Sequence, residues 1–154
     1  MTECSENGKV SMDDWMKLVS GRIAAGQKLQ ISPRGSSMYP LLVGKRDEVI
    51  LTRLDRPLKR GDICMFRRYD GTYVIHSIHH IDHGNLYFLG ESQIYIEGPI
   101  AAEQVVARAE SFIRKGREYS CSSLWYRMMH EIWIFLRPLR PILIETYRGV
   151  MKRH

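Results

Sequence analysis

Two short motifs contain side chains that together could perform nucleophilic chemistry. The first is the turn Gly35-Ser36-Ser37-Met38-Tyr39-Pro40, and the second is the strand-like run Tyr73-Val74-Ile75-His76 further along the chain. A serine hydroxyl is a weak nucleophile at neutral pH, so it needs a nearby base to take its proton. The sequence therefore offers Ser37 as a candidate nucleophile and His76 as a candidate base, although a histidine within an apolar strand is also typical of a packed core residue.

The turn has features that suit such a serine. Gly35 allows a tight backbone turn, and Pro40 fixes the exit from it. The backbone N–H groups of Gly35, Ser36 and Ser37 could form an oxyanion hole. Ser36 is a competing nucleophile, but its side chain is expected to point the other way. The residues after the serine, Met38, Tyr39 and Pro40, are candidate substrate-binding residues, and an ordinary serine-rich turn is the alternative interpretation.

Two glutamates could complete a catalytic triad by orienting the imidazole of His76. Glu91 and Glu97 flank a loop after the strand-like run 86–89, and a carboxylate there could stabilise the protonated imidazole. An isolated glutamate is more often simply exposed to solvent.

Three further histidines, His79, His80 and His83, raise the alternative of a zinc site. Strand alternation would place His76 and His80 on one face and His79 on the other. No cysteine or carboxylate pair completes a tetrahedral set, so we expect neither a metal site nor a cofactor.

The elements that must position these residues can be read from hydrophobic spacing. Ser11 is a candidate helix cap, and apolar residues follow it at helical spacing as far as residue 23, before Gly26. Short strands are expected at 29–31, 48–52, 63–66, 73–78, 85–89 and 105–109, with Asp70-Gly71 as a hairpin turn. This pattern predicts a mainly β fold with an antiparallel, barrel-like core.

The C-terminal segment is expected to be helical again. Its apolar residues form one stripe, opposed by Arg127, His130 and Glu131, and the run 137–141 breaks the helix before a second basic amphipathic piece. The stripe consists of Trp125, Met128, Met129, Ile132, Trp133 and Leu136. The predicted organisation is a disordered lead (1–10), one globular domain (11–119) with its core at 29–109, and a helical tail (120–154).

Composition restricts the partners and the compartment. The net charge is +6, and six of the Lys and Arg residues lie within 120–154 against two glutamates, which predicts an anionic partner for the tail rather than nucleic acid. Three irregularly spaced cysteines suggest free thiols in a reducing compartment. We expect neither a secretory signal peptide nor a membrane-spanning segment, and hence a cytoplasmic protein that could lie peripherally at a membrane.

Taken in order, the motifs resemble the serine peptidase clan of type I signal peptidases and LexA-type self-cleaving proteins. The resemblance covers about residues 29–109 and depends on Gly35–Pro40, Asp47-Glu48-Val49, Lys59–Ile63, Tyr73–Ile78, Gly90-Glu91-Ser92 and Glu103–Val106. It implies a barrel-like peptidase core, Ser37 as nucleophile and His76 as base, as in the histidine-type branch. Ser77 stands where that branch usually has arginine. Glu97 corresponds to its later acid and Glu91 to its Gly-Asp-Asn motif, both with Glu in place of Asp. We therefore favour Glu97 as the third member that orients His76, with Glu91, which we expect to shape the loop, as the alternative.

The resemblance implies a serine endopeptidase that cleaves a leader or precursor peptide, similar to small standalone bacterial members that have no N-terminal membrane anchor. The alternative is a catalytically inactive module of the same fold that binds a peptide or a membrane-associated partner. The helical tail could contact a membrane surface, pack on the β core or form a homodimer.

Overall fold

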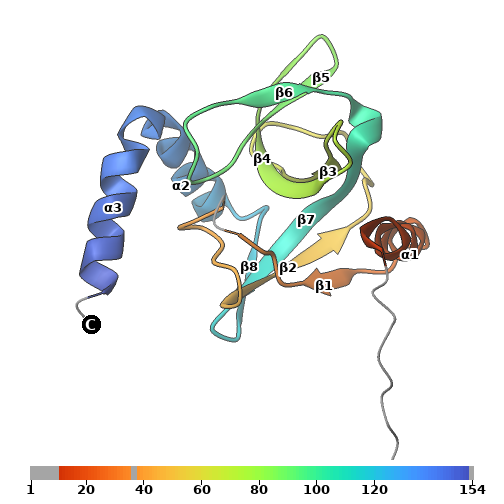
Figure 1. The fold of residues 1–154 in the computed structure, drawn as a ribbon, viewed down its shortest axis with the longest axis horizontal. Coiled ribbons are helices and arrows are strands. Elements are labelled where there is room, and N and C mark those ends of the chain that lie inside the picture. The colour runs from red at the N-terminus through yellow and green to blue at the C-terminus, as the bar shows by residue number, and fades with distance from the viewer. Residues whose placement is uncertain (1–10, 36–37, 153–154) are drawn as a thin grey trace, which may run out of the picture.

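The computed structural model describes residues 11–35 and 38–152, and in these ranges it is built around one antiparallel β-sheet (Figure 1). The predicted disordered lead, together with Ser36 and Ser37, lies outside the described residues. The strands are β1 (Leu29–Ile31), β2 (Asp47–Thr52), β3 (Ile63–Arg67), β4 (Tyr73–Asp82), β5 (Asn85–Leu89), β6 (Glu97–Ile100), β7 (Val105–Arg114) and β8 (Arg117–Ser120). The predicted mainly β class is therefore confirmed.

The order of the strands brings distant parts of the sequence together. The order is β1-β2-β7-β3-β4-β5-β6, and β8 pairs with β7 outside this path. Since β1 and β6 are at opposite ends of this order, the sheet stays open. Strands β3 to β6 curl into a ring in Figure 1, whereas β2 and β7 run together away from it.

Helix α1 (Met12–Ala24) forms as its sequence predicts. The Ser11 hydroxyl accepts a hydrogen bond from the backbone N–H of Asp14, which satisfies one of the free donors at the helix start. Met16, Val19 and Ile23 form the buried face of the helix. They pack in a core cluster with Val49 and other residues of β2, β3 and β7.

Two expectations about the strands were wrong. Strand β6 begins at Glu97, in a segment expected to be a loop, and β8 was not expected at all. The expected alternation of the histidines also fails, because the register of β4 and β5 shifts between Ile78 and His80. This bulge brings the Nδ1 atoms of His79 and His80 within 2.8 Å of each other instead of placing them on opposite faces.

The C-terminal segment contains two α-helices and a short 3-10 turn. Helix α2 (Leu124–Phe135) is followed by η2 (Arg137–Leu139) and α3 (Arg140–Met151), so the helix break falls where Pro138 predicts it. Both helices lie on the side of the molecule away from α1, and α3 stands beside the sheet rather than on it (Figure 1). None of the helices in the described ranges is long and apolar enough to cross a membrane.

Candidate functional site

The turn that carries the candidate nucleophile is fixed on both sides of the undescribed Ser36 and Ser37. Gly35 has φ +88°, a conformation that glycine adopts without strain. Gly44 packs so closely against this turn that a Cβ at its position would lie 2.8 Å from the carbonyl oxygen of Pro33. The backbone just before the serines is therefore held against the segment that follows them.

A buried carboxylate holds the exit from the turn. The Asp47 side chain is fully buried and accepts hydrogen bonds from the backbone N–H of Val43 and from the Arg46 guanidinium. Burial alone would raise the pKa of Asp47, but these hydrogen bonds and the Arg114 charge lower it below its usual value. Arg114 also donates to the carbonyl oxygens of Pro40 and Leu41, so it links the turn to β7.

The three candidate substrate-binding residues have different environments. Met38 is buried in the same core cluster as Ile63 and Met65, and Ile75, the neighbour of His76, packs against that cluster. Tyr39 contacts the Tyr147 ring of α3, whereas Pro40 lines a groove beside α2 and α3. Tyr39 and Pro40 therefore lie at the surface of a groove, while Met38 anchors the turn in the core.

His76 lies deep in the ring formed by β3 to β6. It is only 1% exposed, and its ring meets the Phe66 ring edge-on at 6.0 Å. Its Nδ1 atom has no hydrogen-bond partner among the residues that the structure describes, although Glu97 Oε2 is 3.5 Å away. Burial lowers the pKa of His76 to about 4, partly opposed by the Glu97 charge. The imidazole is therefore neutral at neutral pH and can accept a proton.

Glu97 is held next to His76 by an arginine. Arg68, in the turn after β3, binds both carboxylate oxygens of Glu97 at 2.5 and 2.8 Å. A paired guanidinium of this kind fixes the plane and position of a carboxylate. It also supplies a positive charge that competes with a protonated imidazole for Glu97, and this charge lowers the pKa of His76 further.

Glu91, the alternative third member, faces different partners. It is 2% exposed, and its Oε1 atom accepts from the Ser77 hydroxyl at 2.8 Å and lies 2.9 Å from His130 Nε2 on α2. The expectation that His130 lies on the polar side of the C-terminal helix was wrong. His130 is buried, because Glu91 and the helix pack against each other. Of the two glutamates, Glu97 is the one that the structure brings next to His76.

The C-terminal helices also hold the backbone of the loop between β5 and β6. The fully buried Arg140 donates to the carbonyl oxygens of Gly90, Gln93 and Trp133. The Trp133 indole N–H donates to the carbonyl oxygen of Glu91. This loop leads directly to Glu97, so α2 and α3 position the segment that ends beside His76. Arg140 was not predicted as a site residue, because it lies in a segment whose many basic residues are typical of a solvent-exposed tail.

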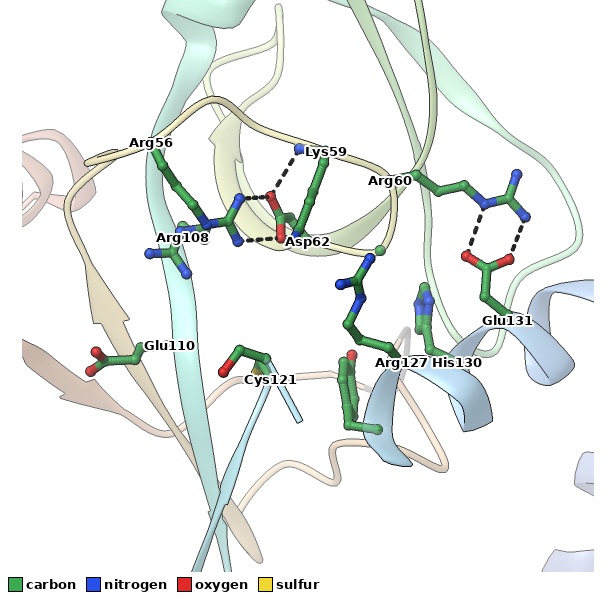
Figure 2. A pocket seen from close by; sticks show the side chains of 13 residues that line it. Arg56, Lys59, Arg60, Asp62, Arg108, Glu110, Cys121, Arg127, His130 and Glu131 are labelled. Carbon is green, nitrogen blue, oxygen red and sulfur yellow. Dashed lines mark hydrogen bonds and ion pairs between the residues drawn. The ribbon is translucent and has the colours of Figure 1, made fainter. Parts of the chain in front are cut away.

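A cationic pocket of about 230 Å³ lies where α2 meets the turn before β3. Figure 2 shows that Arg60 from this turn pairs with Glu131 from α2, at 3.0 and 2.8 Å. In the same turn, Asp62 accepts from Arg56 and from the backbone N–H of Lys59. The Arg60–Glu131 pair therefore joins α2 to the turn before β3, whereas the Arg56–Asp62 pair holds that turn together.

The turn at Gly61-Asp62 is also hydrogen-bonded to the strand that carries His76. The Gly61 N–H donates to the Ile78 carbonyl oxygen, and the Ile78 N–H donates to the Asp62 carbonyl oxygen. These two backbone hydrogen bonds explain why a tight Gly-Asp turn stands just before β3. It fixes the start of β3 beside the middle of β4, and Cys64 then pairs with His76 in the sheet register.

A second and larger cavity is a groove of about 680 Å³ between the sheet and the C-terminal helices. One wall includes Tyr39, Pro40 and Phe112, and the other includes Trp133 and Ile144. The groove therefore begins at the residues that follow the candidate nucleophile.

His79, His80 and His83 do not come together as a ligand set. His80 stacks on the Tyr87 ring at 4.3 Å, and burial lowers the pKa of His79 to about 4. Within residues 11–35 and 38–152, no group of three or more His, Cys, Asp or Glu side chains could hold a metal ion. No protein-family model matches this chain, and the comparison with curated proteins found no match either.

Proposed function

We propose that the protein is a serine endopeptidase in which Ser37 is the nucleophile, His76 the general base and Glu97 the residue that orients His76. The observation that carries this proposal is the buried imidazole of His76 with Glu97 Oε2 at 3.5 Å from its Nδ1. A carboxylate on Nδ1 leaves Nε2 to face the nucleophile and favours the imidazolium that forms during catalysis.

The proposed reaction is ordinary acyl transfer. The Ser37 oxygen attacks the scissile carbonyl carbon while His76 takes the hydroxyl proton, and the resulting oxyanion is stabilised by backbone N–H groups of the 35–37 turn. His76 then gives the proton to the leaving amine, which leaves an acyl-enzyme. Water, deprotonated by His76, hydrolyses that ester and regenerates Ser37.

The fold and the groove are consistent with a peptide substrate. The proposed core is of the signal-peptidase or LexA type, with β3 to β6 as its barrel-like part, and its substrate would lie extended along a strand edge beside the 35–40 turn. By the resemblance to signal peptidases and LexA-type proteins, the substrate is a leader or precursor peptide with small residues before the cut.

A specific observation favours a second candidate, a catalytically inactive module of the same fold that binds peptides. Glu97 already has both oxygens bound to Arg68, and Nδ1 of His76 makes no hydrogen bond within the described structure. A carboxylate neutralised in this way stabilises an imidazolium less than a free one does.

A serine-reactive fluorophosphonate probe distinguishes the two candidates. In the peptidase, the wild type and the matched control Ser36→Ala are labelled, and the labelled peptide contains Ser37. Ser37→Ala is not labelled, and His76→Gln, checked for folding by circular dichroism, is labelled far more slowly. Folded wild-type protein that resists the probe, or labelling that persists in Ser37→Ala, would remove Ser37 from the mechanism.

A further inference from the structure

Helix α2 has two apolar faces, and the sheet covers only one of them. The inner face packs against the rest of the protein through Tyr126, His130 and Ile134. The expected single stripe is therefore divided, since Met129, Trp133 and Leu136 are partly buried whereas its other members are exposed. The exposed apolar side chains of α2 are Leu124, Trp125, Met128, Ile132 and Phe135, which we call the outer face.

The outer face is a continuous stripe along the whole helix. At the spacing of an α-helix, its five residues fall within an arc of about 100°. Leu124 and Phe135, at the two ends, are each 83% exposed, and Trp125 is 66% exposed. Leu139, Ile142 and Val150 add further exposed apolar side chains on η2 and α3. Single exposed apolar residues are normal on a protein surface, but a stripe of this length marks an interaction site.

The charges around the outer face indicate what binds there. Arg127 lies next to the stripe on α2, and Arg137 lies on η2 just after that helix, whereas Arg148 and Lys152 lie in α3 and at its end. No carboxylate partner is found for these four side chains in the described part of the chain. The Arg148 guanidinium lies over the Tyr39 ring, 5.0 Å from the ring centroid. Of the two glutamates in this segment, Glu131 is paired with Arg60, which leaves Glu145. The outer face is therefore an apolar stripe with Arg127 and Arg137 next to it, in a C-terminal segment of net positive charge.

We propose that the outer face of α2, with the basic side chains beside it, binds the surface of an anionic lipid bilayer. An apolar stripe flanked by arginines is the pattern of a helix that lies in the interface plane, with its apolar side chains among the acyl chains and its cations at the headgroups. A second copy of the chain fits less well, because it would bring two basic surfaces together. At about 1.5 Å per residue, the twelve residues of α2 extend about 18 Å along the surface.

The structure also determines which experiment is informative. Removing residues 120–154 would remove buried Tyr126, Ile134 and Arg140 and so disturb the core. Substitutions on the outer face leave those contacts in place. The test variant is Met128→Gln/Ile132→Gln/Phe135→Gln in the full chain. The matched control is Leu54→Gln/Ile81→Gln/Ile94→Gln, which removes the same kind of exposed side chain elsewhere on the surface.

The measurement is co-sedimentation with vesicles of phosphatidylcholine alone and of an equimolar mixture with phosphatidylglycerol. The wild type and the control should bind the anionic vesicles about tenfold more tightly than the neutral ones, and the outer-face variant should lose about tenfold in binding. Added salt should weaken binding. The proposal is overturned if the wild type does not bind anionic vesicles or if the variant binds like the control. It is also overturned if light scattering shows a dimer that the variant abolishes while vesicle binding is unchanged.

Discussion

Replacing Arg140 by methionine tests whether the C-terminal helices hold the loop between β5 and β6. Methionine keeps much of the apolar volume but removes the donors to the carbonyl oxygens of Gly90, Gln93 and Trp133. A buried carbonyl left without a donor costs about 1–3 kcal/mol, so three of them cost about 3 kcal/mol at the low end of that range. Burial also disfavours the charged guanidinium and lowers the pKa of Arg140. Replacing the guanidinium therefore removes this desolvation cost and offsets part of the destabilisation.

The expected net loss in the free energy of unfolding is about 2–3 kcal/mol. In urea, with a slope of about 2 kcal/mol per molar, the unfolding midpoint should fall by about 1 M. Arg137→Met is the matched control, since the Arg137 side chain makes no hydrogen bond or ion pair within the described residues, and it should change stability by less than about 0.5 kcal/mol. If Arg140→Met is as stable as this control, the arginine does not hold the loop, and the argument that the tail positions the segment before Glu97 fails.

Two further outcomes follow from buried side chains. The pKa of His76 in the folded protein, about 4, lies below the usual histidine value of 6.5. The contribution of the neutral imidazole to the free energy of unfolding is therefore fully present above pH 6.5 and is lost as the pH falls toward 4. At about 1.4 kcal/mol per pH unit, the wild type should lose about 3 kcal/mol more than His76→Gln over that range in urea unfolding; equal losses would contradict the buried neutral state. The buried Tyr126 hydroxyl has no hydrogen-bond partner among the described residues, so Tyr126→Phe should leave stability unchanged or raise it by up to about 1 kcal/mol in the same assay. A clear loss would show that the hydroxyl is satisfied in solution.

The parts of the fold that the sequence predicts are those that short-range chemistry determines. The Ser11 cap, the apolar spacing of α1 and the Asp70-Gly71 hairpin each involve residues within a few positions of one another. The β-strand at 97–100 was missed because Gly98 and Pro99 stand inside it, and these residues usually indicate a loop. Strand β8 was missed because all four of its residues are exposed, so they carry no alternation of apolar and polar side chains.

The parts of the site that could not be predicted depend on contacts between distant segments. The spacing of residues in α2 predicts His130 on the exposed polar side of the helix. In the structure it is buried against Glu91, which lies 39 residues earlier in the sequence. Arg140 similarly has the sequence context of a solvated tail, and its acceptors lie in the β5–β6 loop. The proposed roles of Ser37, His76 and Glu97 rest on spacing and resemblance, and Glu97 lies 3.5 Å from His76 because β6 pairs with β5.

Helix α2 takes part in both proposals. Its inner face supports the proposed active site, and its outer face is the proposed lipid-binding surface. His130 on the inner face and the partly buried Trp133 hold the segment before Glu97. The outer-face residues Leu124, Met128 and Phe135 are exposed and are not among the residues that line the groove beside the 35–40 turn. Substitutions on the inner face should therefore impair probe labelling of Ser37 without a selective loss of vesicle binding. Substitutions on the outer face, such as Phe135→Gln, should reduce vesicle binding while probe labelling stays at the wild-type rate. A peptidase held at a lipid surface in this way would meet its precursor peptides there. Variants that alter only the inner face or only the outer face would test the proposed catalysis and the proposed lipid binding separately.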